Sequence, residues 1–289
     1  MSTGLADDVK AGVVPPEDIH ASFFTLITAT LGLFVTAVGL VWMWQVPTAS
    51  PVLPLWLEIV GPVLIAVAVT SHIDHLANRI GHFAVISTIV GVFLWGAAYL
   101  PFAINNLNYG STTWQRFFYS MWGTAFLLFS LTLFVVAWHK EDRLEHQDLA
   151  KEHIIHVSFP VLIIAAIGTL LFSCGLFDLA FNPTGSSPMT WVLEAVGPLL
   201  LAVAVTLHID HMSKHIGRFA VVLGIVGMFV WALPNIPLAF KPSLVHSSDW
   251  GPFLTNGCFG LGYALLGLTA LLLVLRKSKL EKNGAVMSW

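Results

Sequence analysis

The sequence predicts an all-α integral membrane protein whose eight transmembrane helices form two parallel four-helix repeats, related by a pseudo-two-fold axis along the membrane normal. Three observations support this prediction: the composition, eight long apolar runs and an internal duplication. Of the 289 residues, 56% are hydrophobic and 10% are charged, whereas soluble domains are roughly 45–50% apolar and about 25% charged. So few charged side chains cannot solvate the surface of a globule, which excludes a soluble enzyme, a disordered chain and a nucleic-acid-binding protein.

Eight apolar runs are each long enough to cross the ~30 Å hydrocarbon core of a bilayer as a helix that rises about 1.5 Å per residue. Turn-forming residues separate the runs, for example between positions 46 and 51 and between positions 105 and 110. The predicted spans are residues 21–44, 53–72, 83–104, 117–138, 157–176, 189–208, 219–240 and 252–275.

A duplication divides the chain into two four-span units. Residues 57–75 align without a gap with residues 193–211, at an offset of 136 positions, and both copies end in H-I-D-H. Because four spans are an even number, both copies enter the membrane from the same side, which predicts parallel repeats. The shared small residues favour close helix packing, and the fourth spans match poorly. The predicted units are a cytoplasmic N-terminal segment (1–19), repeat one (20–139), a charged cytoplasmic connector (140–155), repeat two (156–276) and a cytoplasmic tail (277–289).

The basic residues predict the orientation of the chain in the membrane. Of the 13 Lys and Arg residues, all but Arg116 and Lys241 fall on one side of an eight-span arrangement. The positive-inside rule then places both termini in the cytoplasm of a cell whose plasma membrane holds the protein. Tryptophans near the predicted span ends are expected to be interfacial anchors; they are Trp44, Trp56, Trp114, Trp138, Trp191 and Trp250.

Ionisable residues recur at the same places in the two repeats. Ionisable groups inside apolar runs are costly in hydrocarbon and mark functional sites by default. A histidine also opens the first span of each repeat, so we expect three imidazoles to gather in each half at the cytoplasmic boundary, from His20, His72 and His75 and from His156, His208 and His211. The accompanying carboxyl groups are expected to be proton carriers or to orient a histidine ring; they are Glu58, Asp74, Glu194 and Asp210.

These histidines favour a membrane subunit of a redox complex, which binds haem b or a quinone near the cytoplasmic face. Imidazole is a common axial ligand of haem iron and a ligand of non-haem metals, and a histidine beside a carboxyl group suits a quinone. The four histidines of the duplicated motif, His72, His75, His208 and His211, are the predicted ligands. Besides the lipid bilayer, the predicted partners are other subunits of the complex, which would dock on the 140–155 connector; as an enzyme, the chain would supply the electron-transfer subunit of an oxidoreductase.

Three alternatives stay open at the level of the sequence. The first is a permease for a transition-metal ion or a proton-coupled solute, although the span centres are almost purely apolar and the polar exceptions Asp178, Asn235 and Asn256 lie toward the outer side. The second is a membrane oxidase with a non-haem metal. The third is a purely structural membrane subunit, in which the histidines cap helix ends.

Overall fold

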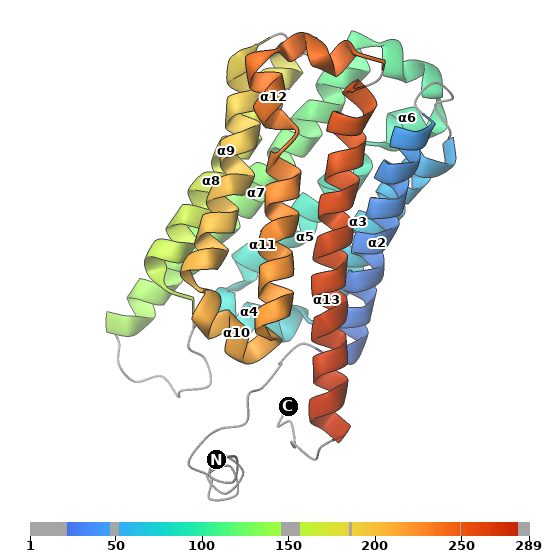
Figure 1. The fold of residues 1–289 in the computed structure, drawn as a ribbon. Coiled ribbons are helices and arrows are strands. Elements are labelled where there is room, and N and C mark those ends of the chain that lie inside the picture. The colour runs from blue at the N-terminus through green and yellow to red at the C-terminus, as the bar shows by residue number, and fades with distance from the viewer. Residues whose placement is uncertain (1–21, 47–51, 146–156, 185–186, 249, 283–289) are drawn as a thin grey trace, which may run out of the picture.

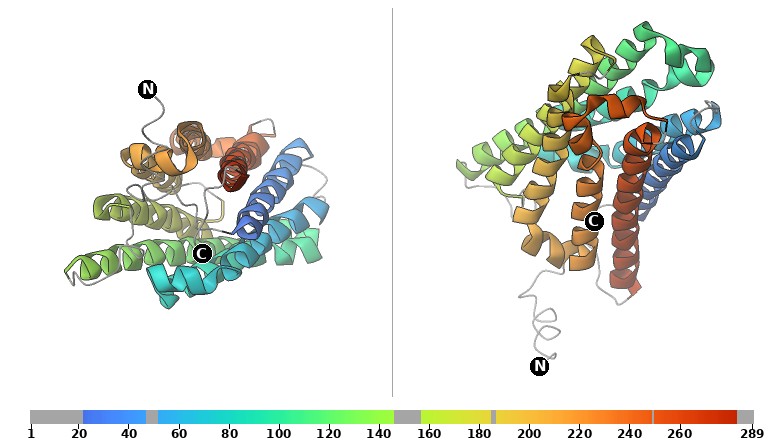
Figure 2. Two further views of the ribbon diagram at one scale, coloured as in Figure 1. Left: turned by 90° about the horizontal axis from the view of Figure 1, so that it is seen from below. Right: turned by 45° about the horizontal axis from the view of Figure 1, so that its top comes forward.

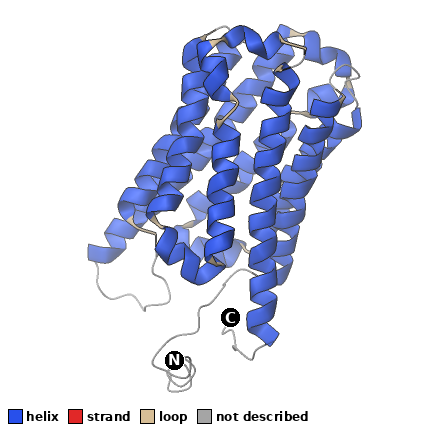
Figure 3. Ribbon diagram, viewed as in Figure 1, coloured by secondary structure: helices blue, strands red, loops and turns tan. Residues whose placement is uncertain are grey.

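The computed structural model describes residues 22–46, 52–145, 157–184, 187–248 and 250–282, and these residues form helices joined by short turns (Figure 3). Within these residues, eight helices are long and apolar enough to cross a membrane, which confirms a multi-pass, all-helical membrane protein. The spans are α2 (Phe23–Gln45), α3 (Val52–Thr70), α5 (His82–Ala97) with α6 (Leu100–Ile104), α7 (Thr112–Glu145), α8 (Phe159–Phe181), α9 (Pro188–Leu207), α11 (Arg218–Ala232) with α12 (Asn235–Phe240), and a π-helical turn (Phe253–Gly257) with α13 (Cys258–Lys282).

Short helices mark the two ends of the bundle (Figure 1). At one end lie α4 (Ile73–Ile80) and α10 (Ile209–Ile216), which contain most of the two H-I-D-H motifs. At the other end lie α6 and α12, followed by two short 3₁₀ helices (Asn106–Gly110 and Pro242–His246). We call these the α4/α10 end and the α6/α12 end.

The second span of each repeat stops just before its H-I-D-H motif. His72 (φ −123°, ψ 20°) and His208 (φ −110°, ψ 12°) have non-helical backbones. The hydroxyl of Thr70, the last residue of α3, and that of Ser71, which follows it, donate to carbonyls of the last turn of α3, at 2.8 Å each. Such bonds compete with continuation of the helix. His72 therefore precedes a separate helix that contains His75, and the span predicted to end at residue 72 ends at Thr70.

A glycine ends each of the short helices α4 and α10. Gly81 has φ 88° and ψ 147°, and Gly217 has φ 90° and ψ 139°. Residues with a Cβ rarely adopt this region, so only glycine turns the chain here into α5 and α11 without strain.

The eight spans form a closed ring in chain order. Each span packs against the one before and the one after it, and α13 closes the ring against α2; the view along the bundle shows this arrangement (Figure 2). The last span of the first repeat, α7, packs against the first span of the second repeat, α8. Residues on the inner faces of spans from both repeats form the main hydrophobic core.

Glycines set the closest approach of neighbouring spans at equivalent positions of the two repeats. A Cβ on Gly32 would lie 2.7 Å from the carbonyl oxygen of Gly61, and a Cβ on Gly168 would lie 2.7 Å from that of Gly197. The backbones of α2 and α3, and of α8 and α9, therefore touch directly, as small residues allow in membranes. This confirms the close helix packing that the shared small residues favoured.

The fourth spans also make equivalent contacts, although their sequences match poorly. The Thr132 hydroxyl of α7 lies 3.2 Å from the carbonyl oxygen of Ala84, and the Thr269 hydroxyl of α13 lies 3.3 Å from that of Ala220. The two alanines are 136 positions apart but the two threonines are 137 apart. The fourth spans are therefore offset by one residue more than the rest of the repeat, so a gap-free alignment of the two repeats does not reveal that they are equivalent. The pseudo-two-fold axis itself stays a prediction.

The described Lys and Arg residues lie mostly at one end of the bundle, as the predicted orientation in the membrane requires. Arg116 follows the α6/α12 end, and Lys241 lies there too, whereas the other described Lys and Arg positions lie at or near the α4/α10 end. The positive-inside rule assigns the α4/α10 end to the cytoplasm, and this assignment remains a prediction.

We expect Gly168→Ala to lower the free energy of unfolding by about 1–3 kcal/mol, because its Cβ would overlap the backbone of α9. Alanine gains ~1 kcal/mol in helix propensity, which opposes this loss, but overlap with backbone atoms, which cannot move aside as a side chain can, makes destabilisation the expected net result. Thermal unfolding in detergent measures the effect. Gly110→Ala is the matched control, since nothing lies within 4 Å of the Cβ it would add; equal melting temperatures for the two variants would contradict the packing argument.

Candidate functional site

A cavity of about 670 Å³ lies inside the ring of spans and is lined in part by the turns at the α6/α12 end. Its mouth contains polar side chains, among them Gln115, His246 and Asn256. Its walls are aromatic and aliphatic and come from both repeats. The aromatic lining consists of Tyr99, Phe102, Phe118, Tyr119, Trp122, Phe172, Trp191 and Phe259.

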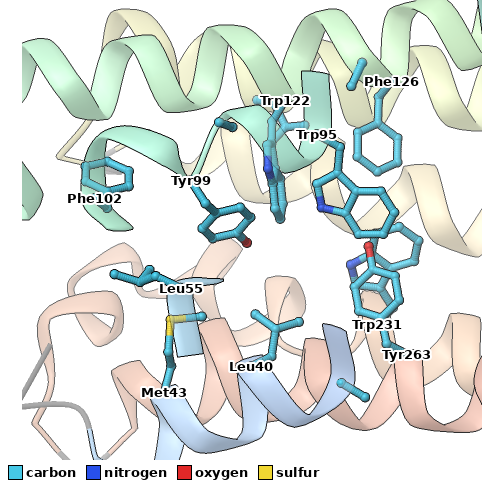
Figure 4. Close-up of a cluster of buried hydrophobic side chains, with 14 of the residues drawn as sticks. Leu40, Met43, Leu55, Trp95, Tyr99, Phe102, Trp122, Phe126, Trp231 and Tyr263 are labelled. Carbon is cyan, nitrogen blue, oxygen red and sulfur yellow. The ribbon is translucent and has the colours of Figure 1, made fainter. Parts of the chain in front are cut away.

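The aromatic rings pack against one another, which fixes the shape of the cavity walls. Tyr99 contacts Phe118 edge to face, with ring centroids 5.0 Å apart, and Phe118 contacts Trp122 at 5.1 Å. In Figure 4, Tyr99 and Trp122 point into the cluster from one side and Leu40 faces them from α2 on the other. Deeper in the ring, Tyr263 of α13 stacks on Trp95 at 5.3 Å. A preformed apolar cavity of this size suits an organic ligand.

Glu194 of α9 lies on the cavity wall and is only 3% exposed. Its Oε1 atom has no hydrogen-bond partner among the described residues. Tyr119 of α7 and Asp178 of α8 lie within electrostatic range of its carboxyl group. Asp178 accepts hydrogen bonds from the Thr190 hydroxyl and from the Asn182 amide (3.3 Å). Hydroxyl and amide groups, rather than a cation, therefore surround this pair of carboxyl groups in the described part of the chain.

Glu58 occupies the corresponding position in α3 and is completely buried. The Tyr99 side chain and the backbone of Leu40 face its carboxyl group, and Tyr263 of α13 lies within electrostatic range. A Cβ on Gly39 would overlap the Glu58 carboxyl group, so this glycine makes room for it. Glu58 is therefore held between α2, α3 and α13, and it is not part of the cavity lining.

Each buried glutamate precedes a proline by four residues within its helix: Glu58 precedes Pro62 and Glu194 precedes Pro198. Proline has no N–H, so the carbonyl four residues earlier loses its helical donor. The carbonyl that is freed belongs to the glutamate itself. In the second repeat the side chain of Asn235 replaces the missing donor, since its Nδ2 donates to the Glu194 carbonyl oxygen at 3.0 Å.

Further buried polar atoms around the ring interior have no hydrogen-bond partner within the described ranges. Buried polar atoms in proteins are nearly always paired, so each such atom calls for an explanation, such as a functional role or water. Those of residues that line the cavity, belong to the aromatic cluster or bond to Glu194 are Trp95 Nε1, Trp122 Nε1, Glu194 Oε1 and Asn235 Oδ1.

The predicted histidine clusters lie at the opposite end and are only partly described. His20 and His156 lie outside the described residues, and the side chains of His75 and His211 are not described either. His72 and His208 are half-buried. Among the described side chains, no three of His, Cys, Asp and Glu come close enough to hold a metal ion. The histidine ligands therefore stay a prediction.

The packing of the two H-I-D-H helices, α4 and α10, is relevant to whether one haem could be bound between the two repeats. α4 packs against α5 and α7, and α10 packs against α11 and α13. Each helix thus contacts spans of its own repeat, an arrangement that gives no support to a haem bound between His72 and His208. Asp74 and Asp210 are exposed.

The expected role of the tryptophans was wrong at one position that matters for the site. Trp56, Trp114, Trp138 and Trp250 are exposed, as interfacial anchors should be. Trp191, by contrast, is only 4% exposed and lines the cavity. It contacts the inner faces of other elements because α9 turns this residue toward the ring interior.

The aromatic cavity was not predicted from the sequence, although the sequence contains one signal of it. Phe118, Trp122 and Phe126 recur at four-residue spacing, which places them on one face of α7. Such a face inside an apolar span can equally pack against lipid, so the spacing alone did not identify a site. Comparisons of the chain with profiles of known families, with curated proteins and with solved structures found no match.

We expect Asn235→Leu to lower the free energy of unfolding by about 1–3 kcal/mol, because the buried Glu194 carbonyl loses its donor. In a Pro198→Ala background the new backbone N–H at position 198 can supply that donor, so the same substitution should cost less. Unfolding of the four proteins in detergent forms a double-mutant cycle. An equal loss in both backgrounds would show that Asn235 does not compensate for the proline.

Proposed function

We propose that this protein is a proton-coupled permease, which takes a water-borne solute into the central cavity from the α6/α12 end. The observation that supports this best is Glu194: a buried carboxyl group on the wall of a cavity, with no cationic partner among the described side chains. Ionisable residues inside membrane bundles commonly form proton and substrate pathways. We place the protein in the plasma membrane with the α4/α10 end in the cytoplasm.

The cavity mouth favours a solute that arrives from water. The residues at the mouth come from the segments that join spans, including Gly110, Val245 and Ser247. A ligand dissolved in the lipid would instead need an opening between two spans. The sequence favoured a redox subunit over a permease because the span centres are apolar. In the fold, however, Glu194 lies close to Asp178 and Asn235, and this group of polar side chains supports a permease.

The two buried glutamates provide the proton-carrying groups of the proposal. An ionised carboxylate that is removed from water costs several kcal/mol unless it is compensated, so each group favours either a proton or a bound cation. Tyr119 and Asp178 face Glu194, whereas Tyr99 and Tyr263 face Glu58. Glu194 can exchange its proton with a solute in the cavity, and Glu58 is a second proton acceptor in the interior.

In proteoliposomes that contain a trapped pH-sensitive dye, we expect one class of external solute to change the internal pH. The panel consists of organic cations, organic anions and uncharged solutes, and protein-free liposomes give the background. Glu194→Gln should reduce the response at least tenfold, because an amide carries no exchangeable proton charge. Asp142→Asn is the control, since position 142 lies on α7 beyond the span. A response to no class, or a full response in Glu194→Gln, would contradict the proposal.

A redox subunit is a second candidate, and one observation favours its quinone form. Two residues of the cavity lining carry buried polar atoms that are unpaired in the described residues: the donor Trp122 Nε1 and the acceptor Glu194 Oε1. A quinone accepts hydrogen bonds at its carbonyl oxygens, and the quinol donates them. Haem b or another metal centre on His72 and His208 belongs to the same proposal, as does a partner subunit that docks on the 140–155 connector.

An absorption spectrum of the purified protein, before and after dithionite, tests the redox candidate together with quinone analysis of an organic extract. If it holds, we expect a Soret band whose α band sharpens on reduction, lost when both His72 and His208 are replaced by Ala, or bound quinone that Glu194→Gln depletes. A featureless spectrum and an extract without quinone would exclude both forms.

A further inference from the structure

We propose that the central cavity binds a monovalent organic cation, a substituted ammonium or phosphonium ion with bulky apolar groups, whose charge lies against Glu194. The inference deepens the proposed permease by naming its substrate class. Binding itself can be measured without transport, so the two proposals can fail separately.

The charge of the cavity favours a cation. Glu194 is part of the cavity lining, its buried Oε1 atom has no hydrogen-bond partner among the described residues, and Asp178 lies within electrostatic range of its carboxyl group. Among the residues that the structure describes, the lining contains neither Lys nor Arg. Its one imidazole, His246, is engaged through Nε2 with the carbonyl oxygen of Thr184 at 3.0 Å. An anion in this cavity would meet like charge and no compensating cation, whereas a cation would meet a desolvated carboxyl group.

The walls of the cavity supply the second part of the recognition. Aromatic faces attract cations through the ring quadrupole, and tryptophan and tyrosine attract them most strongly. Tyr99, Trp122 and Trp191 all line the cavity, and ring contacts hold Tyr99 and Trp122 in place, with centroids 5.8 Å apart. An aromatic enclosure around a carboxyl group is the arrangement that suits quaternary ammonium ions.

The size of the cavity selects among cations. Its volume of about 670 Å³ lies within the range of roughly 300–1,000 Å³ typical of sites for drug-sized ligands. Ammonium or an alkali metal ion would leave most of that apolar surface without contacts. Phe118, Phe172 and Phe259 line the same space, so the ligand must carry aryl or alkyl groups to fill it.

The exchange of a proton for the organic cation conserves charge, because the entering cation replaces the proton on the Glu194 carboxyl group.

The test is equilibrium dialysis of the detergent-solubilised full chain against tetraphenylphosphonium, with a detergent-only chamber as the blank. Tetraphenylborate has nearly the same shape and the opposite charge. We expect saturable binding of tetraphenylphosphonium and no saturable binding of tetraphenylborate. The two ions are dialysed separately, because together in one chamber they would pair and precipitate. Glu194→Gln should weaken binding at least tenfold, and Trp122→Leu should weaken it about threefold to thirtyfold. Trp114→Leu is the matched control, because Trp114 is exposed and does not line the cavity.

The outcomes separate the two proposals. Equal binding of the two ions, or unchanged tetraphenylphosphonium affinity in Glu194→Gln, overturns the cation inference and leaves the permease to be judged by the proton measurement. Saturable, Glu194-dependent binding without any proton movement supports the cation site and overturns the permease. The comparison of the two ions uses the unaltered protein, so it decides the inference even if Glu194→Gln does not fold.

Discussion

The cost of holding two carboxyl groups out of water inside a membrane is the constraint on which the rest of this structure depends. Glu58 is fully buried and Glu194 nearly so, and each sits where a proline four residues later removes the donor of its own carbonyl. Neighbouring residues offset part of this cost. Gly39 leaves space for the Glu58 carboxyl group, and Asn235 donates to the Glu194 carbonyl. Natural membrane proteins tolerate such expensive groups chiefly where they serve a function.

Neither four-span repeat could build this site alone. Tyr119 of the first repeat approaches Glu194 of the second, and Tyr263 of the second repeat approaches Glu58 of the first. These contacts exist because α7 packs against α8 and α13 closes against α2, which brings the fourth span of each repeat beside the other repeat. The closed ring is therefore what converts two apolar bundles into one interior with polar groups at its centre.

The two copies agree where they pack and differ where the cavity lies. Gly61 and Gly197 occupy equivalent positions and make equivalent backbone contacts. At the cavity, by contrast, Leu55 of the first repeat corresponds to Trp191 of the second, and Tyr99 corresponds to Asn235. Identity at these glycines thus reflects helix packing, whereas the differences at the cavity place Glu194, but not Glu58, among the residues that line it. The repeated H-I-D-H motifs lie at the other end of the bundle, away from that cavity.

The sequence by itself determined the eight spans, the turns between them and the placement of both glutamates inside apolar runs, because hydrophobic run length is a local property. It also indicated the small residues at which spans approach closely. Only the tertiary structure decided that residues such as Phe118, Trp191 and Phe259 enclose one cavity, since periodicity shows which side chains share a face of one helix and not which faces meet. For the same reason Trp191 resembled an interfacial anchor, and the one-residue shift of the fourth spans concealed their equivalent packing until helix contacts revealed it.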